Sequence, residues 1–515
     1  MTIEAFKVDR TAPLLVEGAR FHTMDELVPR ADWMVVLGDK IQRLGVGPAP
    51  AVNQRLSLTG RTVVPGFVDS HIHFSQTGLD SLLVDLSPAT NLDEVRARLA
   101  AEARGKRNWI FARGYEEDAL VDRGLLTRKL LDDWFPDRPV WIGRIDYHSS
   151  VINSAALRKL ETPIGLRGML VAEGEPTGIL RSEAFQHARQ RLARYFPHDT
   201  MNKAIKAATA LCSAHGITAV QALEGGELFG DEGMTALLRR EDLLPLDVTI
   251  FIQEKNPFLT TKLGFTHVGG CILIDGSIGS YTAALEEDYL NLPGQQGLLY
   301  ERTRELGNFV SEAHQAGVQL AFHAIGPRAI GQLLGTYEKA LAKSPRYDHR
   351  HRIEHFELAT DEQIHRARDL GVLVAMQPTF ELNWGGPKGM YASRIGEGWR
   401  KTNRLRTILD RGMRIAGGSD ANVTPPNPLL GIHAAVNHPN PEQRVTPHEA
   451  LRMMTLDAAF AGFNDRRHGS LSRGKDANFA VLARDPLKAK ASTLRDIRVL
   501  ETWYLGRRVY AAPAA

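Results

Sequence analysis

The chain has 515 residues, a length that can bury a large core and suits one elaborated domain with a smaller satellite. Its 63 lysines and arginines against 60 aspartates and glutamates leave a formal net charge of +3 without a long basic run, so nucleic acid is not an implied partner. Cys212 and Cys271 are the only cysteines, which excludes a disulfide framework and suits a reducing compartment.

The first fifteen residues carry charged side chains at Glu4, Lys7, Asp9 and Arg10 and offer no apolar segment of a signal peptide. No run of about 18 apolar residues follows, so we expect no membrane partner. These features predict a soluble cytoplasmic protein.

Both ends of the chain are rich in short strand-like pieces, over residues 14–58 and, in the tail, 469–510. We expect these ends, residues 1–62 and 469–515, to pair into one small β domain. The larger unit between them comprises residues 63–468.

In the larger unit, short apolar runs alternate with segments of helical period, a pattern typical of parallel strands with crossover helices. Helices are expected at residues 304–316, 329–341 and 361–370. Eight strands are expected, at residues 63–74, 216–223, 246–253, 270–275, 318–324, 350–358, 372–377 and 413–420. Eight such β/α units predict a closed (β/α)8 barrel, an α/β fold of the TIM type.

A long insertion interrupts this alternation after the first barrel strand. It covers residues from about 79 to 215 and contains its own strand-like runs at residues 109–114 and 139–147. An insertion at this point would overhang the mouth of the barrel.

Two histidines, His71 and His73, stand one residue apart at the end of the first barrel strand. Alternate side chains of a strand share a face, so the two imidazoles would lie side by side, as metal ligands do. His323, His355 and Asp420 end three later strands, and a barrel builds its active site at these ends. A lone histidine at a strand end is an ordinary core or hydrogen-bonding residue, but this set together predicts a metal site.

Several motifs follow one family pattern. They are PGFVDSHIH at residues 65–73, DGSIGSYTAAL at 275–285, HAIG at 323–326, RIEH at 352–355, GSD at 418–420 and GSLSRGKDAN at 469–478, with DYHS at 146–149 and NSAAL at 153–157 in the insertion. Through them the sequence resembles the amidohydrolase superfamily of metal-dependent hydrolases, and within it amidohydrolase family 3, also called YtcJ-like. The resemblance runs essentially end to end. It implies a distorted TIM barrel with a split β-sandwich domain.

The resemblance also implies roles for the strand-end residues. His71 and His73 would hold a first divalent metal, and His323 and His355 a second where there is one. Nitrogen, oxygen and sulfur ligands favour zinc. The metal would generate hydroxide from bound water, and Asp420 would bridge metal binding and proton transfer as general base and acid.

One position departs from the pattern of binuclear relatives. Many of them carry a carboxylated lysine at the end of the fourth strand, where this chain has Cys271. A thiolate is a competent metal ligand, so Cys271 is a candidate bridge between two ions. Alternatively, Cys271 is only a small apolar residue that fills the barrel. The site would then hold one ion, or Lys255 would be the carboxylated ligand.

A residue of the insertion should stabilise the oxyanion opposite the metal. His148 is the first candidate and Tyr115 the second, and the alternative for both is surface or interdomain packing.

Asp275, Gln377 and Trp384 are candidate substrate-binding residues. Trp384 lies in an aromatic-rich segment, residues 380–399, that follows the seventh strand and could form a pocket or a lid. Its aromatic residues favour an apolar or aromatic substrate moiety; a packed surface loop is the alternative.

The favoured function is hydrolysis of an amide or related C–N bond of a small molecule, the reaction class of the resembling subgroup. A deaminase of a cyclic amidine or ring substrate is the alternative, but His323-Ala-Ile-Gly lacks the glutamate typical of those enzymes. A non-catalytic binding scaffold is the third reading, against which the intact ligand set argues. A homodimer is the usual expectation for barrels of this size.

Overall fold

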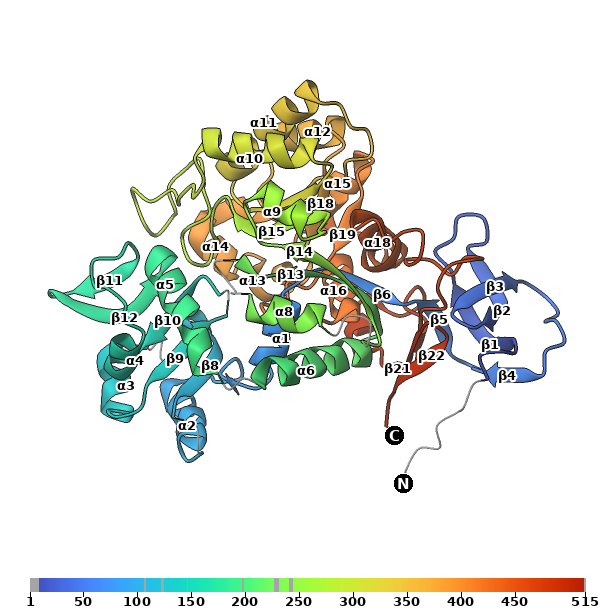
Figure 1. Cartoon of the computed structure of the whole chain (residues 1–515), viewed down its shortest axis with the longest axis horizontal. Coiled ribbons are helices and arrows are strands. Elements are labelled where there is room, and N and C mark those ends of the chain that lie inside the picture. Colours follow the sequence, from blue (N-terminus) through green and yellow to red (C-terminus); the bar gives the residue numbers. More distant parts are fainter. Residues whose placement is uncertain are drawn as a thin grey trace.

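A barrel of eight parallel strands forms the centre of the computed structural model (Figure 1), which describes residues 9–105, 108–121, 125–145, 147–196, 199–226, 231–239 and 244–513. The barrel strands are β6 (Phe67–Ile72), β13 (Ile217–Glu224), β14 (Asp247–Ile252), β15 (His267–Leu273), β16 (Gln319–Ala324), β17 (Arg352–His355), β18 (Leu373–Met376) and β19 (Ile415–Gly417). Each coincides with an expected strand. The first and last strands approach through a parallel bridge between Ile72 and Ala421, so the barrel is nearly closed, and the predicted fold class is confirmed.

The barrel strands are buried on both faces because helices cover them from outside. Every residue of β13 is buried, including the polar residues Thr218, Gln221 and Glu224. The three expected helices are present as α10 (Thr303–Gln315), α11 (Pro327–Lys343) and α12 (Asp361–Asp369). Further helices of the barrel are α1 (Phe74–Asp80), α6 (Thr200–Ala214), α8 (Glu232–Leu238), α9 (Pro257–Lys262), α15 (Leu405–Asp410), α16 (Pro428–Val436), α17 (Pro447–Arg452) and α18 (Ala458–Ala461).

The two ends of the chain share one sheet, as expected, at the right of Figure 1. Its strands are β1 (Leu14–His22), β2 (Arg30–Leu37), β3 (Lys40–Gly45), β4 (Gln54–Ser57), β5 (Thr62–Pro65), β20 (Phe479–Leu482), β21 (Val499–Tyr504) and β22 (Arg507–Ala511). The antiparallel pair β5–β20 joins the N-terminal strands to the C-terminal ones, with Val64 opposite Ala480. Because β5 leads directly into β6, this sheet anchors the strand that carries the histidine pair.

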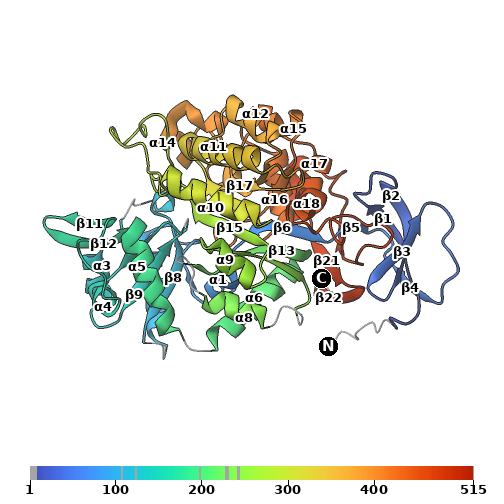
Figure 2. The same cartoon turned by 45° about the horizontal axis from the view of Figure 1, so that its top comes forward.

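The insertion forms a third sheet at the opposite end of the molecule, and both views place the barrel between the two (Figures 1 and 2). Its strands are β7 (Val84–Asp85), β8 (Ile110–Tyr115), β9 (Val140–Arg144), β10 (Ser149–Ile152), β11 (Met169–Ala172) and β12 (Glu175–Arg181). The helices α2 (Leu92–Ala103), α3 (Arg128–Trp134), α4 (Ser154–Lys159) and α5 (Ser182–Leu192) pack with it. Helix α6, by contrast, lies against α1, where Gly78 permits close approach to the Ala204 carbonyl.

The aromatic segment after the seventh strand is helical rather than a loop. It comprises α13 (Thr379–Trp384), α14 (Met390–Ile395) and a 3₁₀ helix (Gly396–Lys401). Phe380 and Trp384 are four residues apart and their ring centroids lie 4.9 Å from each other, so one helical turn brings them together. No helix in the described part of the chain combines the length and apolar character needed to cross a membrane.

A chain of buried histidines lies at the N-terminal ends of the barrel strands, away from the predicted metal site. The Leu320 N–H donates to His351 Nδ1, so the other nitrogen of His351 donates to His314 Nδ1, at 2.8 Å. His314 in turn donates to the Ser344 carbonyl at 2.6 Å. This network needs a neutral His351, and burial holds the pKa of His351 well below its usual value.

We expect this network to make the protein sensitive to acid. The pKa of His351 in the folded protein lies below its value of about 6.5 in the unfolded chain. The contribution of neutral His351 to the free energy of unfolding is therefore complete above about pH 6.5 and is lost as the pH falls. For this one group the free energy of unfolding should drop by about 1.4 kcal/mol between about pH 7.5 and 5.5. Urea unfolding at the two pH values measures the drop. His351→Phe should be less stable near neutral pH but show a smaller drop, and an unchanged drop would contradict the assignment.

Candidate metal centre

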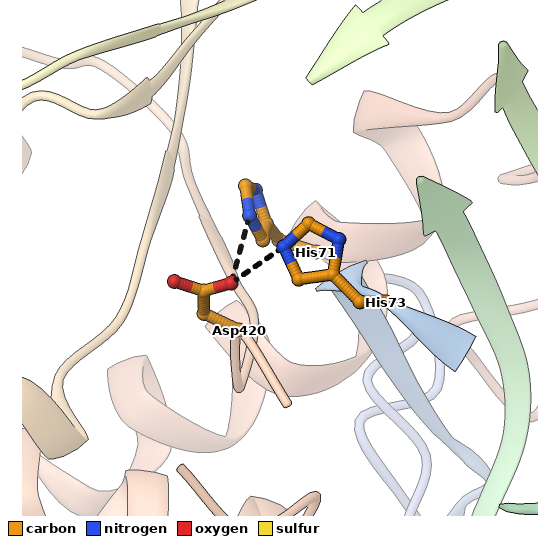
Figure 3. A group of neighbouring side chains, drawn as sticks. All are labelled: His71, His73 and Asp420. Atoms are coloured by element: carbon orange, nitrogen blue, oxygen red, sulfur yellow. Dashed lines mark ion pairs between the residues drawn. The ribbon is translucent and has the colours of Figure 1, made fainter. Parts of the chain in front are cut away.

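His71, His73 and Asp420 meet where the first and last barrel strands end (Figure 3). The Asp420 Oδ1 atom lies 3.2 Å from His71 Nε2 and 3.1 Å from His73 Nε2. All three side chains are buried. Among the described residues they are the group of His, Cys, Asp and Glu whose ligand atoms all lie within 4.8 Å of one another.

Backbone contacts between the two strand ends position these three residues. Asp420 N–H donates to the His71 carbonyl at 2.8 Å, and His73 N–H donates to the Ala421 carbonyl at 2.6 Å. A side chain at position 418 would collide with the His71 backbone, at 2.8 Å from its nitrogen, so Gly418 is required for this approach. Asp420 itself has a φ of 53°, a turn that directs its carboxylate toward the histidines.

Glu354 orients His71, a role that the sequence analysis did not assign. His71 Nδ1 lies 2.6 Å from Glu354 Oε2. Arg352 donates to both Glu354 oxygens, at 2.8 and 2.7 Å, and all three side chains are buried. The charges of Arg352 and His71 hold the pKa of Glu354 below its usual value, although burial opposes them. Since strand alternation places Arg352 and Glu354 on one face, a carboxylate facing the barrel could have been expected.

These contacts fit a bound cation. With Nδ1 donating to Glu354, the lone pair of His71 faces Asp420 Oδ1 through Nε2, and neither atom has a hydrogen-bond partner among the described residues. Two lone pairs 3.2 Å apart in a buried site need a proton or a metal ion between them. Burial disfavours a charged ring, but Asp420 and Glu354 raise the pKa of His71 to about 9. The site therefore attracts positive charge.

His323 and His355 lie beside this group but outside its 4.8 Å limit. Their ring centroids are 4.5 Å apart, and His355 is 4.9 Å from His71. Burial lowers the pKa of His355 to about 4 and that of His323 well below its usual value, so both rings are neutral, the form that binds metals. Gln377, expected at the substrate, is fully buried, and its Oε1 lies 2.7 Å from His355 Nδ1.

Cys271 lines the cavity that also contacts His73, His323 and Asp420, but its sulfur lies outside the 4.8 Å group. Burial raises the pKa of its thiol. Lys255 forms an ion pair with Glu301, and its side chain is 55% exposed.

The structure brings one of the two oxyanion candidates to the site. The His148 ring lies 5.6 Å from the His323 ring, between centroids, and lines the same cavity. Tyr115 instead belongs to the buried core of the insertion, where its hydroxyl accepts a hydrogen bond from Leu126 N–H at 3.0 Å. Tyr115 is thus packed inside the inserted sheet and is not among the residues that line the cavities at the candidate ligands.

Asp275 is fully buried and fastens the loops beside the site. Its carboxylate accepts hydrogen bonds from the backbone N–H groups of Ala284, Ile325 and Gly326, at 2.8, 2.9 and 2.7 Å. Burial raises its pKa to about 7, and these backbone donors act in the opposite direction. Trp384 donates to Glu116 Oε1 at 2.9 Å and lines a pocket that also contacts His323, His355 and Asp420.

A polar outer cleft of about 460 Å³ opens beside the site, with Cys271, Leu273 and Tyr300 among its lining residues. The same three residues line the cavity at His73 and Asp420, so the cleft is continuous with the site. A small molecule can approach the histidines from this cleft.

Replacing Glu354 by Gln should weaken metal binding by about 10- to 100-fold. A neutral amide is a weaker acceptor than a carboxylate, so it would no longer fix the proton of His71 on Nδ1 and leave Nε2 free for the metal. Competition with a fluorescent chelator measures the affinity. Glu338→Gln, at an exposed position on α11, is the control and should bind metal like the wild type. Thermal unfolding shows whether Arg352 still packs, and an unchanged affinity in a folded Glu354→Gln variant would contradict the role.

Comparisons with known proteins agree on the family and the fold. Residues 55–510 match the amidohydrolase family. The chain is 30% identical over 492 residues to the putative amidohydrolase YtcJ of Bacillus subtilis, covering 89% of this chain and 90% of that protein. It is 26% identical over 544 residues to the N-substituted formamide deformylase of Arthrobacter pascens, covering 96% and 97%. An uncharacterized metal-dependent hydrolase from Pyrococcus furiosus superposes with a TM-score of 0.73 at 26% identity, over 92% of this chain and 100% of that one.

Proposed function

Since this chain belongs to the amidohydrolase family, we propose that it hydrolyses an amide or related non-peptide C–N bond of a small molecule at a divalent metal bound by His71 and His73. The observation that carries the proposal is the pair of short contacts from Asp420 Oδ1 to the two imidazoles. The similarity to an N-substituted formamide deformylase supports N-acyl or N-formyl amines as the first substrates to test.

When bound, a divalent metal activates water near neutral pH and polarises the carbonyl of the substrate. His71 and His73 would hold it together with Asp420, and Glu354 keeps the Nε2 lone pair of His71 facing Asp420. Asp420 accepts the proton of the attacking water and returns it to the leaving nitrogen. His148, whose ring lies 5.6 Å from that of His323, is the proposed partner of the developing oxyanion.

We further propose zinc as the ion, from the histidine and carboxylate ligands. Free Cys212 and Cys271 agree with a cytoplasmic location, and the barrel size agrees with a homodimer. Asp275 and Gln377 support the site through Ile325 and His355, and Trp384 contacts the substrate pocket.

Asp420→Asn should lower kcat by about 10²- to 10⁴-fold, because an amide cannot take the proton. The assay follows formate and amine release from a panel of N-substituted formamides, with Asp369→Asn, on the exposed end of α12, as the control. Removal of metal with a chelator should abolish the activity, and zinc should restore it. Release of ammonia from ring amidines would instead support a deaminase, and no turnover with any loaded metal would support a binding scaffold.

We also propose that Cys271 contributes to a second ion, because it shares a cavity with His323, His355 and Asp420. Elemental analysis of Cys271→Ser should then show one ion per chain where the wild type holds two. Cys212→Ser is the matched control, since Cys212 is buried in α6. Unchanged stoichiometry and turnover in Cys271→Ser would mean that the thiol only fills the barrel.

A further inference from the structure

An inner pocket adjoins the candidate metal centre and is distinct in character from the polar outer cleft. It shares His148, His323, His355, Asp420 and Val423 with the cavity at the candidate metal centre. The rest of its wall is mostly apolar and aromatic and includes Ile278, Ile325, Phe380, Trp384, Met390 and Tyr391. A substrate bound at the metal centre would therefore place one substituent against this wall.

Besides Asp420, a second buried acid, Glu357, lines this pocket without a full set of partners. Glu357 is 2% exposed, and its Oε2 atom has no hydrogen-bond partner among the described residues. The Tyr391 side chain hydrogen-bonds to the carboxyl group. A buried carboxyl oxygen without a partner costs free energy, so its retention in a substrate pocket calls for a ligand group that satisfies it.

The backbone explains how Glu357 reaches the pocket so soon after a proposed metal ligand. His355 and Phe356 have φ values of 70° and 52°, and these two left-handed residues end the regular alternation of β17. Asn403 N–H then holds the Glu357 carbonyl at 2.9 Å. As a result His355 and Glu357 both line the inner pocket.

The unpartnered Oε2 atom of Glu357 can accept a hydrogen bond from an N–H or O–H group of a ligand. The faces of aromatic rings also attract cations and N–H groups. Arg144 lines the pocket as well, but its Nε donates to both oxygens of Glu117, at 3.1 and 2.9 Å.

We propose that Glu357 is a substrate-binding residue and that the inner pocket takes an apolar, preferably aromatic, substituent carrying a hydrogen-bond donor such as an amine or a hydroxyl group. Glu357 accepts the donor while Phe380, Trp384 and Tyr391 contact the apolar part. This inference rests on the proposed hydrolase function, because it names the part of the substrate that lies beside the scissile bond.

Binding of three small probes tests the inference without requiring turnover. Benzylamine carries a charged donor, benzyl alcohol a neutral donor, and benzyl methyl ether none. By isothermal titration calorimetry on the metal-loaded full chain, we expect at least one donor probe to bind about tenfold more tightly than the ether. Glu357→Leu should abolish this preference. Glu357→Gln keeps the shape of the side chain, and it should lose the preference for benzylamine if the donor must be charged.

Glu381→Gln is the matched control, since Glu381 is also 2% exposed but does not line the pocket, and it should keep the preference. A preference that survives in both Glu357 variants would mean that the amine binds the metal instead, and would overturn the inference. Equal binding of the three probes, or binding of none, would also overturn it. If the probes discriminate as expected but no amide is hydrolysed, the proposed function fails and the assignment of Glu357 stands.

Discussion

The hydrogen bond between His71 Nδ1 and Glu354 is the interaction on which the candidate site depends. Because Nδ1 donates to Glu354, the Nε2 atom of His71 carries a lone pair that faces Asp420 Oδ1. Two electron-rich atoms this close need a proton or a cation between them. Arg352 makes the hydrogen bond between His71 and Glu354 possible, because two hydrogen bonds from its guanidinium group keep the buried Glu354 ionised. The hydrogen bonds from Arg352 to Glu354 and from His71 to Glu354 are therefore as much a part of the candidate site as His73 and Asp420.

The barrel holds Arg352, Glu354 and His71 in fixed positions relative to one another. These residues come from β6 and β17, which are not neighbours in the sheet, and Arg352 also donates to the Ser70 carbonyl at 2.7 Å across the barrel interior. The terminal sheet fixes the start of β6 through β5, while the insertion brings His148 over His323. The candidate ligands, the inner pocket and the outer cleft are thus formed by the barrel together with the insertion.

Sequence patterns predicted the frame because local physics decides it. A barrel strand is a short apolar run that ends in polar residues, and all eight were found from this signal. His71, His73 and Asp420 were found for the same reason, since strand ends meet at one face of a barrel. The segment with Trp384 was expected as a loop because it contains several glycines. It is helical, because a helix places Phe380 and Trp384, four residues apart, on one buried face.

What the sequence by itself determined is the barrel, the shared terminal sheet, the insertion and the set of histidines and carboxylates at the strand ends, all of which follow from periodicity along the chain. Only the tertiary structure decided which side chains come into contact at the site and which pack elsewhere. Tyr115 packs inside the insertion, Glu354 turns toward His71, and Glu357 enters the aromatic pocket. Such contacts depend on strand register and on left-handed turns at His355 and Asp420, and these are set by packing between segments distant in the sequence.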